Sequence, residues 1–344
     1  MVPAMNAPVF LQQRFVEEYQ YSVAVVVLDG VSLTTVAAAT EPFHLVNRML
    51  SRDRFRLQFV SPPGEDPITQ TGIPIPCSTS MAEICHGPTN MRPDIVVVCG
   101  GQQTNVEPTL ERFLRCLMRW RCRTFVIGDA VAVAGKVGLV RGESCAVHWS
   151  SLAALNEQHP DLEFKRMLFS SGSHVATCAG EFAVFDMIVN YIEDVCGPEI
   201  GAEVCNHFLA HGKRSGSTEQ ILTGDALICD DEKFHQAIKI MAENIEEPVT
   251  SAEIADRLGV SPRQVQRIFA NNGFESPLKY YQNLRLNRAQ QLIEQTRMSL
   301  TEVGIACGFE KLSAFNKCFK RRFGVTPREM RNCSGSKRIL VTAA

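Results

Sequence analysis

The chain has 344 residues, of which 45% are hydrophobic and 21% charged, and its formal net charge is −2 at pH 7. This length predicts two or three domains, and the composition is typical of a globular protein with a sizeable core. No run approaches about 18 consecutive apolar residues and residues 1–20 lack a signal-peptide pattern, so we expect a cytoplasmic protein that does not use a membrane as partner. The 13 cysteines are scattered without zinc-ligand spacing, which favours free thiols over disulfides or a metal site. No cofactor is expected.

Residues 21 to about 195 alternate apolar, strand-like runs with helical patterns. Runs this uniformly apolar are typical of strands buried on both faces, as in a parallel sheet between helices. We therefore predict a doubly wound, flavodoxin-like α/β domain whose ligand site lies at the C-terminal ends of the strands. The predicted strands are 21–29, 55–62, 94–101 and 123–129.

The ends of these runs carry small and polar residues. Gly100 and Gly101 close one strand, and Gly128 and Asp129 close another directly before a predicted helix at 131–138. His148 and Trp149 follow, and the sequence TCAG at 177–180 leads into a further helix. A strand-to-helix turn is where enzymes of the nucleophile-elbow type place a Ser or Cys.

A polar, Gly- and Ser-rich stretch at 211–217 indicates an exposed connector. A new helical pattern begins near Asp231 and passes Ile240. The predicted organisation is therefore an N-terminal extension (1–20), an α/β domain (21–211), a linker (212–232), a helical domain (233–332) and a C-terminal tail (333–344).

The helical part contains one pattern twice, at 250–277 and 299–327. Glu253, Gly259, Phe269 and Pro277 in the first copy correspond to Glu302, Gly308, Phe319 and Pro327 in the second. Each copy reads as a helix, a turn at a glycine and a second helix, which is the pattern of a helix-turn-helix. For a single copy, an ordinary pair of packed helices is an equal alternative; the repeat at nearly constant spacing favours the helix-turn-helix.

Charge supports this interpretation. Residues 233–338 hold 18 Lys and Arg against 10 Asp and Glu, a balance of +8, which leaves 17 basic and 27 acidic residues elsewhere, a balance of −10. A basic segment binds DNA by releasing counterions, whereas an acidic one is repelled. Between the copies, 276–295 predicts one helix of about 28 Å, which could hold two recognition helices roughly one DNA turn (~34 Å) apart.

The second helix of each copy would face the DNA. Arg pairs well with guanine and Gln with adenine, so the outward residues of the first copy form an apt set for reading bases: Arg263, Gln264, Gln266 and Arg267. The equivalent residues of the second copy are Ser313, Ala314, Asn316 and Lys317. Lys320, Arg321 and Arg322 follow them and suit phosphates better than bases. For any one of these residues, the alternative is a solvated surface position.

The combined motifs resemble a known family. The runs LDGVSLTTVAAATEPFHLVNR, VVVCGG, VIGDAVAVAGKVGLVRG, AVHW and TCAG are similar to a PfpI/ThiJ (class I glutamine-amidotransferase-like) domain. The later CGF and F-x-x-x-F-x-x-x-F-G-x-T-P patterns resemble the DNA-binding part of AraC/XylS-family transcription regulators. The resemblance spans roughly residues 20–332. It implies a homodimeric regulator, in most cases an activator of a catabolic operon, that binds promoter or operator DNA, RNA polymerase and a small-molecule effector.

The chain departs from the family's enzymes at the elbow. Those enzymes place a nucleophilic cysteine there, with a Glu and a His nearby; the matching positions here are Gly128, Glu41 and His148. Glycine has no side chain to attack a substrate, and nothing in the sequence indicates an activating partner for the adjacent Asp129. We therefore expect that the protein is not an enzyme. The alternative is a PfpI-type hydrolase with a helical accessory domain.

An inactive elbow can still bind a ligand. Glu41 and Asp129 as anions and Trp149 as an aromatic face would suit a cationic amine, beside Gly101, Gly128 and His148. This agrees with the resemblance, which implies effectors such as betaine, carnitine or arginine. The simpler alternatives are that Glu41 caps a helix, that His148 is a satisfied polar residue and that Trp149 belongs to the core.

The second copy also departs from the family pattern. Lys311 stands where relatives carry a Ser or Asp that caps the recognition helix, and a lysine cannot accept the backbone N–H bond. Either this copy is less stable by itself, or Lys311 binds a phosphate that takes over the capping role. We expect the first copy to contribute more of the sequence specificity and the second more of the salt-dependent affinity.

Overall fold

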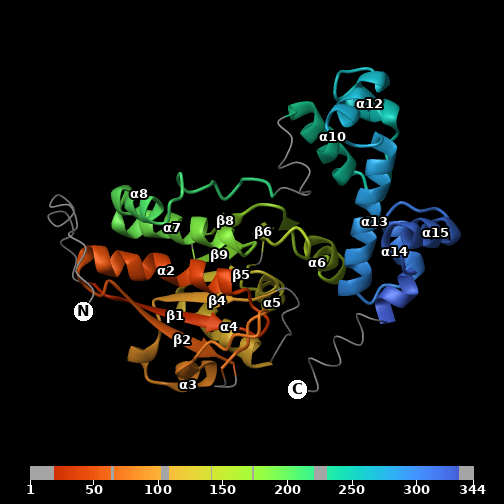
Figure 1. Ribbon diagram of the computed structural model, residues 1–344. Coiled ribbons are helices and arrows are strands. Elements are labelled where there is room, and N and C mark those ends of the chain that lie inside the picture. Colours follow the sequence, from red (N-terminus) through yellow and green to blue (C-terminus); the bar gives the residue numbers. More distant parts are fainter. Residues whose placement is uncertain are drawn as a thin grey trace. The chain divides into compact units, whose positions relative to one another are not determined.

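The computed structural model describes residues 19–62, 66–101, 108–140, 142–172, 174–220 and 231–332. The chain divides into two compact units, Met1–Gln220 and Ile221–Ala344 (Figure 1). The predicted N-terminal extension up to residue 18, the linker residues 221–230 and the C-terminal tail lie outside the described residues. Among the described helices, none is long and apolar enough to cross a membrane.

A seven-stranded sheet forms the centre of the first unit. Its order is β3-β2-β1-β4-β5-β9-β8, and the inner strands β2-β1-β4-β5-β9 have the flavodoxin-like order, which confirms the predicted fold class. All pairs are parallel except β8 with β9, so an antiparallel edge strand completes the sheet. A second, two-stranded sheet pairs β6 (Cys145–Ala146) with β7 (Phe164–Lys165). The strands of the main sheet are β1 (Tyr21–Val27), β2 (Phe55–Ser61), β3 (Thr79–Ser80), β4 (Ile95–Cys99), β5 (Arg123–Ile127), β8 (Phe169–Ser171) and β9 (Val175–Cys178).

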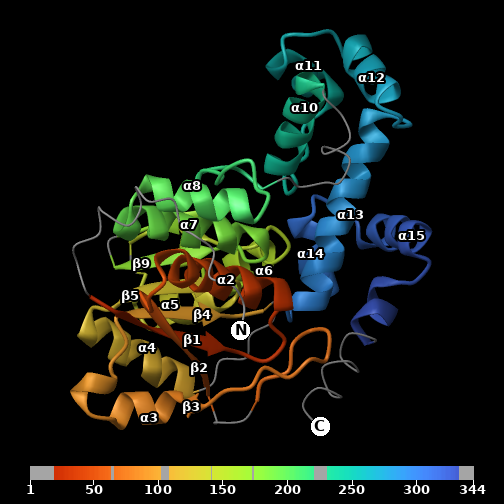
Figure 2. The same cartoon turned by 60° about the vertical axis from the view of Figure 1, so that its left-hand side comes forward.

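Helices cover both faces of the sheet, as the apolar strands predict (Figure 2). Along β1, Val23, Val25 and Val27 contribute to the core on one face, and Ala24 and Val26 to the core on the other. The first face packs against α2 (Leu33–Leu50), α7 (Phe182–Cys196) and α8 (Pro198–His207). The second packs against α3 (Met81–His86), α4 (Pro108–Trp120), α5 (Ala130–Lys136) and α6 (Leu152–Gln158), and a 3-10 turn, η1 (Thr89–Met91), precedes β4.

Residues 213–220, called the boundary segment below, run along the edge strand β8. The Leu168 N–H donates to the carbonyls of Gly216 (3.0 Å) and Thr218 (3.2 Å). Arg214 donates to the buried Asp186 of α7 through its backbone N–H and its guanidinium, at 2.6–2.9 Å. These contacts place the boundary segment with the α/β unit, whereas the composition had predicted a linker from residue 212.

The second unit consists of helices. The long helix α13 (Pro277–Gln295) joins two helix-turn-helix pairs, as predicted. Both views show α12 (Pro262–Asn271) near one end of α13 and α15 (Leu312–Phe323) beside its middle part (Figures 1 and 2). Phe234 of the leading helix α10 packs with Val265 and Phe269 of α12 in one core. The remaining helices are α10 (Glu232–Glu243), α11 (Ser251–Arg257), α12 (Pro262–Asn271), α14 (Leu300–Ala306) and α15 (Leu312–Phe323).

Candidate functional site

Glycines line the C-terminal edge of the sheet where the strand order reverses between β1 and β4. A Cβ on Gly101 would lie 2.2 Å from the Gly30 carbonyl oxygen, and a Cβ on Gly100 would lie 2.7 Å from the Ala130 Cβ. The backbone segments after β1, β4 and β5 therefore approach more closely than any side chain would allow. This edge is the position at which doubly wound sheets bind ligands.

The predicted elbow is at Gly128, directly after β5. Its φ is +66°, its N–H donates to the Cys178 carbonyl at 2.9 Å, and a Cβ would lie 2.5 Å from the Gly100 oxygen. The position has the left-handed backbone of an elbow, but the neighbouring strand end fills the space that a side chain needs. Asp129 follows at the start of α5; it is half-buried and does not cap that helix with its side chain.

Glu181 is a second acidic residue at this edge, beside Asp129, and it is not among the residues predicted from the sequence. It directly precedes α7 as the N-cap residue, with φ 51° and ψ −136°, a conformation that costs a non-glycine residue energy and is concentrated at functional sites. Its carboxylate accepts a hydrogen bond from the Ser32 hydroxyl (2.8 Å), and its N–H donates to the Thr35 hydroxyl (3.0 Å). The start of α2 thus fixes the start of α7.

The predicted Glu41 is in a different place. Thr35 marks the end of α2 that reaches the sheet edge, and Glu41 lies six residues further along the helix, about 9 Å at 1.5 Å per residue. The Glu41 side chain is exposed, whereas Ala39 and Phe43 face the core. The structure therefore points to Glu181 rather than Glu41 as the acid of this site. The signal in the sequence was the Gly180-Glu181 pair directly after a buried strand.

His148 and Trp149 follow the short strand β6. His148 is half-buried and its Nδ1 lies 2.6 Å from the Ser150 hydroxyl. Burial lowers the pKa of His148, and the negative charge of Glu181 acts in the opposite direction. The rings of His148 and Trp149 are 5.4 Å apart between centres. The structure thus places Gly101, Gly128, Asp129 and Glu181 after the C-terminal ends of β4, β5 and β9, and His148 follows the short strand β6.

Gln220, at the end of the boundary segment, holds the loop that carries Trp149. Its side-chain oxygen accepts from the Trp149 N–H (2.8 Å), and its amide nitrogen donates to the carbonyls of Val147 (2.8 Å) and Met167 (2.7 Å). The residue is 8% exposed, so three buried hydrogen bonds tie the end of the first unit to the residues beside His148.

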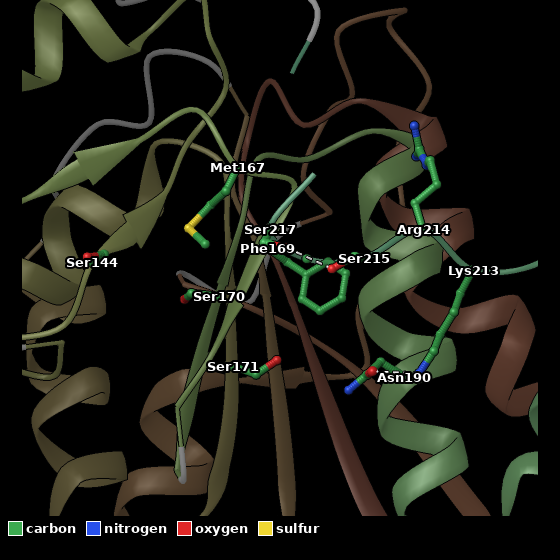
Figure 3. Close-up of a pocket in the computed structure, with 11 residues that line it drawn as sticks. Ser144, Met167, Phe169, Ser170, Ser171, Asn190, Lys213, Arg214, Ser215 and Ser217 are labelled. Atoms are coloured by element: carbon green, nitrogen blue, oxygen red, sulfur yellow. Dashed lines mark hydrogen bonds between the residues drawn. The ribbon is translucent and has the colours of Figure 1, made fainter. Parts of the chain in front are cut away.

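A separate cavity of about 580 Å³ lies between β8, α7 and the boundary segment (Figure 3). None of the predicted ligand residues lines it. Lys213 pairs with Glu193 and donates to Asn190 (2.6 Å), and Arg214 pairs with Asp186 at 2.6 Å. Because carboxylates of α7 neutralise both cations, the cavity is a weak candidate for binding an anion. Its lining consists of Ser144, Met167, Phe169, Ser170, Ser171, Asn190, Lys213, Arg214, Ser215, Gly216 and Ser217.

The first recognition helix, α12, has the start that the sequence predicts. The Ser261 hydroxyl accepts from the Gln264 N–H (3.3 Å), and the Gln264 side-chain oxygen accepts from the Ser261 N–H (2.8 Å). This capping box occupies the oxygen of a side chain that was assigned to base reading. Arg263, Gln266 and Arg267 remain exposed on the same helix.

The second recognition helix, α15, differs from α12 in the contacts that its two ends make. Lys311 makes no side-chain cap bond, as its chemistry predicts. Arg321 donates to Gln282 (3.0 Å) and Arg322 donates to Asn287 (2.7 Å), both on α13, so these two exposed arginines also attach α15 to α13. Ser313, Lys317 and Lys320 are exposed, and Asn316 is half-buried.

Comparison with known proteins agrees with this architecture. A family model described as a helix-turn-helix domain matches residues 254–332. The HTH-type transcriptional regulator GbdR of Pseudomonas aeruginosa is 32% identical over 313 residues, which cover 90% of this chain and 84% of GbdR. The chain belongs to the AraC/XylS family of transcription regulators. The HTH-type transcriptional regulator CdhR of the same species is 29% identical over 88% of this chain and 89% of CdhR.

Among solved structures, an AraC family transcriptional regulator from Pseudomonas putida matches 55% of this chain and 100% of its own, with 20% sequence identity and a TM-score of 0.49. Within this AraC/XylS-family protein, the second unit is the DNA-binding domain. The first unit has the flavodoxin-like strand order, with a left-handed backbone at Gly128 after β5. The individual ligand and DNA contacts stay predictions.

Proposed function

We propose that this AraC/XylS-family regulator activates a catabolic operon when a small cationic amine binds at the sheet edge of its first unit. The observation that carries the proposal is the pairing of two helix-turn-helix motifs with an elbow that holds a glycine. The exposed Arg263, Gln266 and Arg267 support reading of bases by α12, and Lys311, Lys317 and Lys320 support binding of phosphates by α15. As a homodimer, the protein would occupy repeated operator sites and recruit RNA polymerase.

The chemistry of the edge supports a cationic effector. The exposed carboxylate of Glu181 and the half-buried Asp129 supply negative charge, and the Trp149 ring supplies an aromatic face. Together these attract an ammonium group by charge and by cation–π contact. The alternative of a PfpI-type enzyme requires a nucleophile at Gly128, where the Gly100 oxygen occupies the side-chain space.

Replacing Arg267 with alanine is expected to lower specific DNA affinity about 10-fold to 100-fold, because one bidentate contact to a base contributes roughly 1–3 kcal/mol. The measurement is a gel shift on the DNA upstream of the protein's own gene, over a range of salt concentrations and against competitor DNA. Arg257→Ala is the matched control, since it removes an equal charge from an exposed position of α11, outside the recognition helix. Unchanged specific binding by Arg267→Ala would refute base reading by α12.

Glu181→Gln is expected to weaken amine binding by about 10-fold, because it removes a charge that contacts the ammonium group. Glu41→Gln should bind like the parent. Calorimetric titration of the intact protein with betaine, carnitine and arginine tests both variants. The assignment of Glu181 fails if the two variants bind equally well, or if only Glu41→Gln loses affinity.

A further inference from the structure

The long helix α13 contacts the turn of the second helix-turn-helix through one arginine. The Nε–H of Arg285 donates to the Cys307 carbonyl at 2.8 Å, and its Nη2–H donates to the Gly308 carbonyl at 2.5 Å. The guanidinium carbon also lies 4.3 Å from the centre of the Phe309 ring. One half-buried side chain therefore contacts three successive residues of the turn between α14 and α15.

The physical setting makes this contact strong. Carbonyls at the C-terminal end of a helix lack partners within the helix, and a positive charge there complements the helix dipole. The guanidinium supplies two parallel donors to two such carbonyls, which a lysine cannot reproduce. The guanidinium is half-buried, so it has given up part of its hydration to lie in this position, and this burial lowers the pKa of Arg285.

The same turn abuts the first half of the unit. A Cβ on Gly308 would lie 2.6 Å from the Ile245 carbonyl oxygen and 2.5 Å from Pro248 Cγ, in the segment between α10 and α11. One helical turn before Arg285, Tyr281 donates its hydroxyl to the Asn244 carbonyl. Residues 281 and 285 lie on one face of α13, so this face contacts both halves of the unit where they meet.

The turn of the first helix-turn-helix, at Gly259, is more open than the turn at Gly308. Gly259 also has a positive φ, of 63°, but nothing lies within 4 Å of a Cβ built there. The orientation of α12 depends instead on its capping box and on the core around Phe269. In contrast, α15 lacks a side-chain cap at Lys311, and its Phe315 packs on Phe309, 5.3 Å away between ring centres.

We propose that Arg285 is a positioning residue for DNA binding, which fixes the second helix-turn-helix against α13 and so sets the placement of α15 relative to α12. Arg285 acts on α15 through a chain of contacts: it binds the turn, its guanidinium lies over Phe309, and Phe309 packs on Phe315 of α15. Arg285 is assigned to this contact within the protein rather than to DNA, because its half-buried guanidinium donates to two carbonyls of the turn and lies over the Phe309 ring. This inference rests on the proposed function, in which each recognition helix reads one half-site of the operator.

The test uses the full-length protein and a DNA duplex of about 30 base pairs, selected by the wild-type protein from a random pool. Two further duplexes carry a scrambled first or second half-site. Arg285→Met removes the donors and keeps an apolar stem, and Arg285→Lys keeps the charge without the paired donors. Arg297→Met is the matched control, because it makes the same chemical change at an exposed position between α13 and α14.

On the intact duplex, Arg285→Met should bind about 10-fold or more weakly than the wild-type protein, with Arg285→Lys between the two. On the duplex with a scrambled second half-site, Arg285→Met and the wild-type protein should bind alike. A footprint of Arg285→Met on the intact duplex should keep the first half-site and lose the second. Arg297→Met should retain both half-sites.

Two results would overturn the inference. Arg285→Met could bind all three duplexes with the preferences of the wild-type protein, or it could lose equal affinity on every duplex, including the one without a second half-site. If Arg285→Met does not fold, the same two results obtained with Arg285→Lys on the three duplexes would overturn the inference. Selection of a sequence with only one half-site by the wild-type protein would instead refute the proposed mode of DNA binding, separately from the role of Arg285.

Discussion

Replacing Gly308 with alanine is expected to destabilise the second helix-turn-helix by about 3 kcal/mol, against roughly 1 kcal/mol for the same change at Gly259. Both glycines have left-handed backbones, with φ values of +72° and +63°, so alanine meets the same conformational cost at each. Only at Gly308 would the new Cβ collide with backbone and proline atoms, 2.5–2.6 Å away. Overpacking of this kind adds about 1–3 kcal/mol.

Hydrogen exchange on the intact proteins measures the difference. In Gly308→Ala, amides of α14 and α15 should exchange faster, because the turn between these helices is displaced from Ile245 and Pro248. In Gly259→Ala, the smaller effect should be confined to α11 and α12. Equal loss of protection in the two variants would show that the contact of Gly308 with the segment before α11 has no energetic consequence.

Much of the fold can be predicted because its signals are local. The β-branched run at 21–27 is buried on both faces, and that requirement alone identifies a central strand. Each helix of the first repeat begins with a residue whose side chain caps it, Thr250 for α11 and Ser261 for α12. The S-x-x-Q pattern at Ser261 was also visible in the sequence, and it predicts that Gln264 serves the cap rather than a base.

The candidate site is harder to predict because residues far apart in the chain form it. Glu181 meets Ser32 across 149 residues, and Gln220 meets Val147 across 73. No periodicity marks such pairs, and the strands β6, β7 and β8 have only two or three residues each. The match to the family pattern predicts Glu41 as the acidic residue of the site, but the Glu41 side chain is exposed on the side of α2 that faces away from the core of the first unit. The three-dimensional fold, and not the position in the sequence, therefore determines which carboxylate lies at the C-terminal edge of the sheet.

The structure also bears on the different DNA contacts that are proposed for the two repeats. Arg321 and Arg322 donate to α13, whereas Lys311, Lys317 and Lys320 are the exposed lysines proposed to bind phosphates on the second repeat. These three side chains are exposed, and salt would screen their contacts with DNA strongly. The first repeat keeps two exposed arginines and one glutamine for base edges. We therefore still propose that the first repeat contributes more of the sequence specificity and the second more of the salt-dependent affinity.

Replacing Gln220 with alanine is expected to weaken the attachment of the boundary segment by about 3 kcal/mol or more. The change removes the partner of the Trp149 N–H and of the Val147 and Met167 carbonyls, and each buried group left unsatisfied costs about 1–3 kcal/mol. Gln220 is the last residue of the first unit and is bonded next to His148, so the boundary segment connects the proposed effector site to the chain that continues into the DNA-binding unit. Under the proposed function, the variant should bind DNA but lose the change in DNA affinity that the amine causes.

Two measurements check this expectation. Hydrogen exchange should accelerate in peptides spanning 145–149 and 164–169 of Gln220→Ala, and gel shifts with and without the amine should become alike. Glu219→Gln is the matched control: it breaks the Arg166–Glu219 ion pair (2.9 Å), whose Glu219 side chain is 44% exposed, so it should cost about 0–1 kcal/mol and leave the response intact. A normal response in Gln220→Ala, despite faster exchange in both peptides, would mean that the signal leaves the first unit by a route other than these three hydrogen bonds.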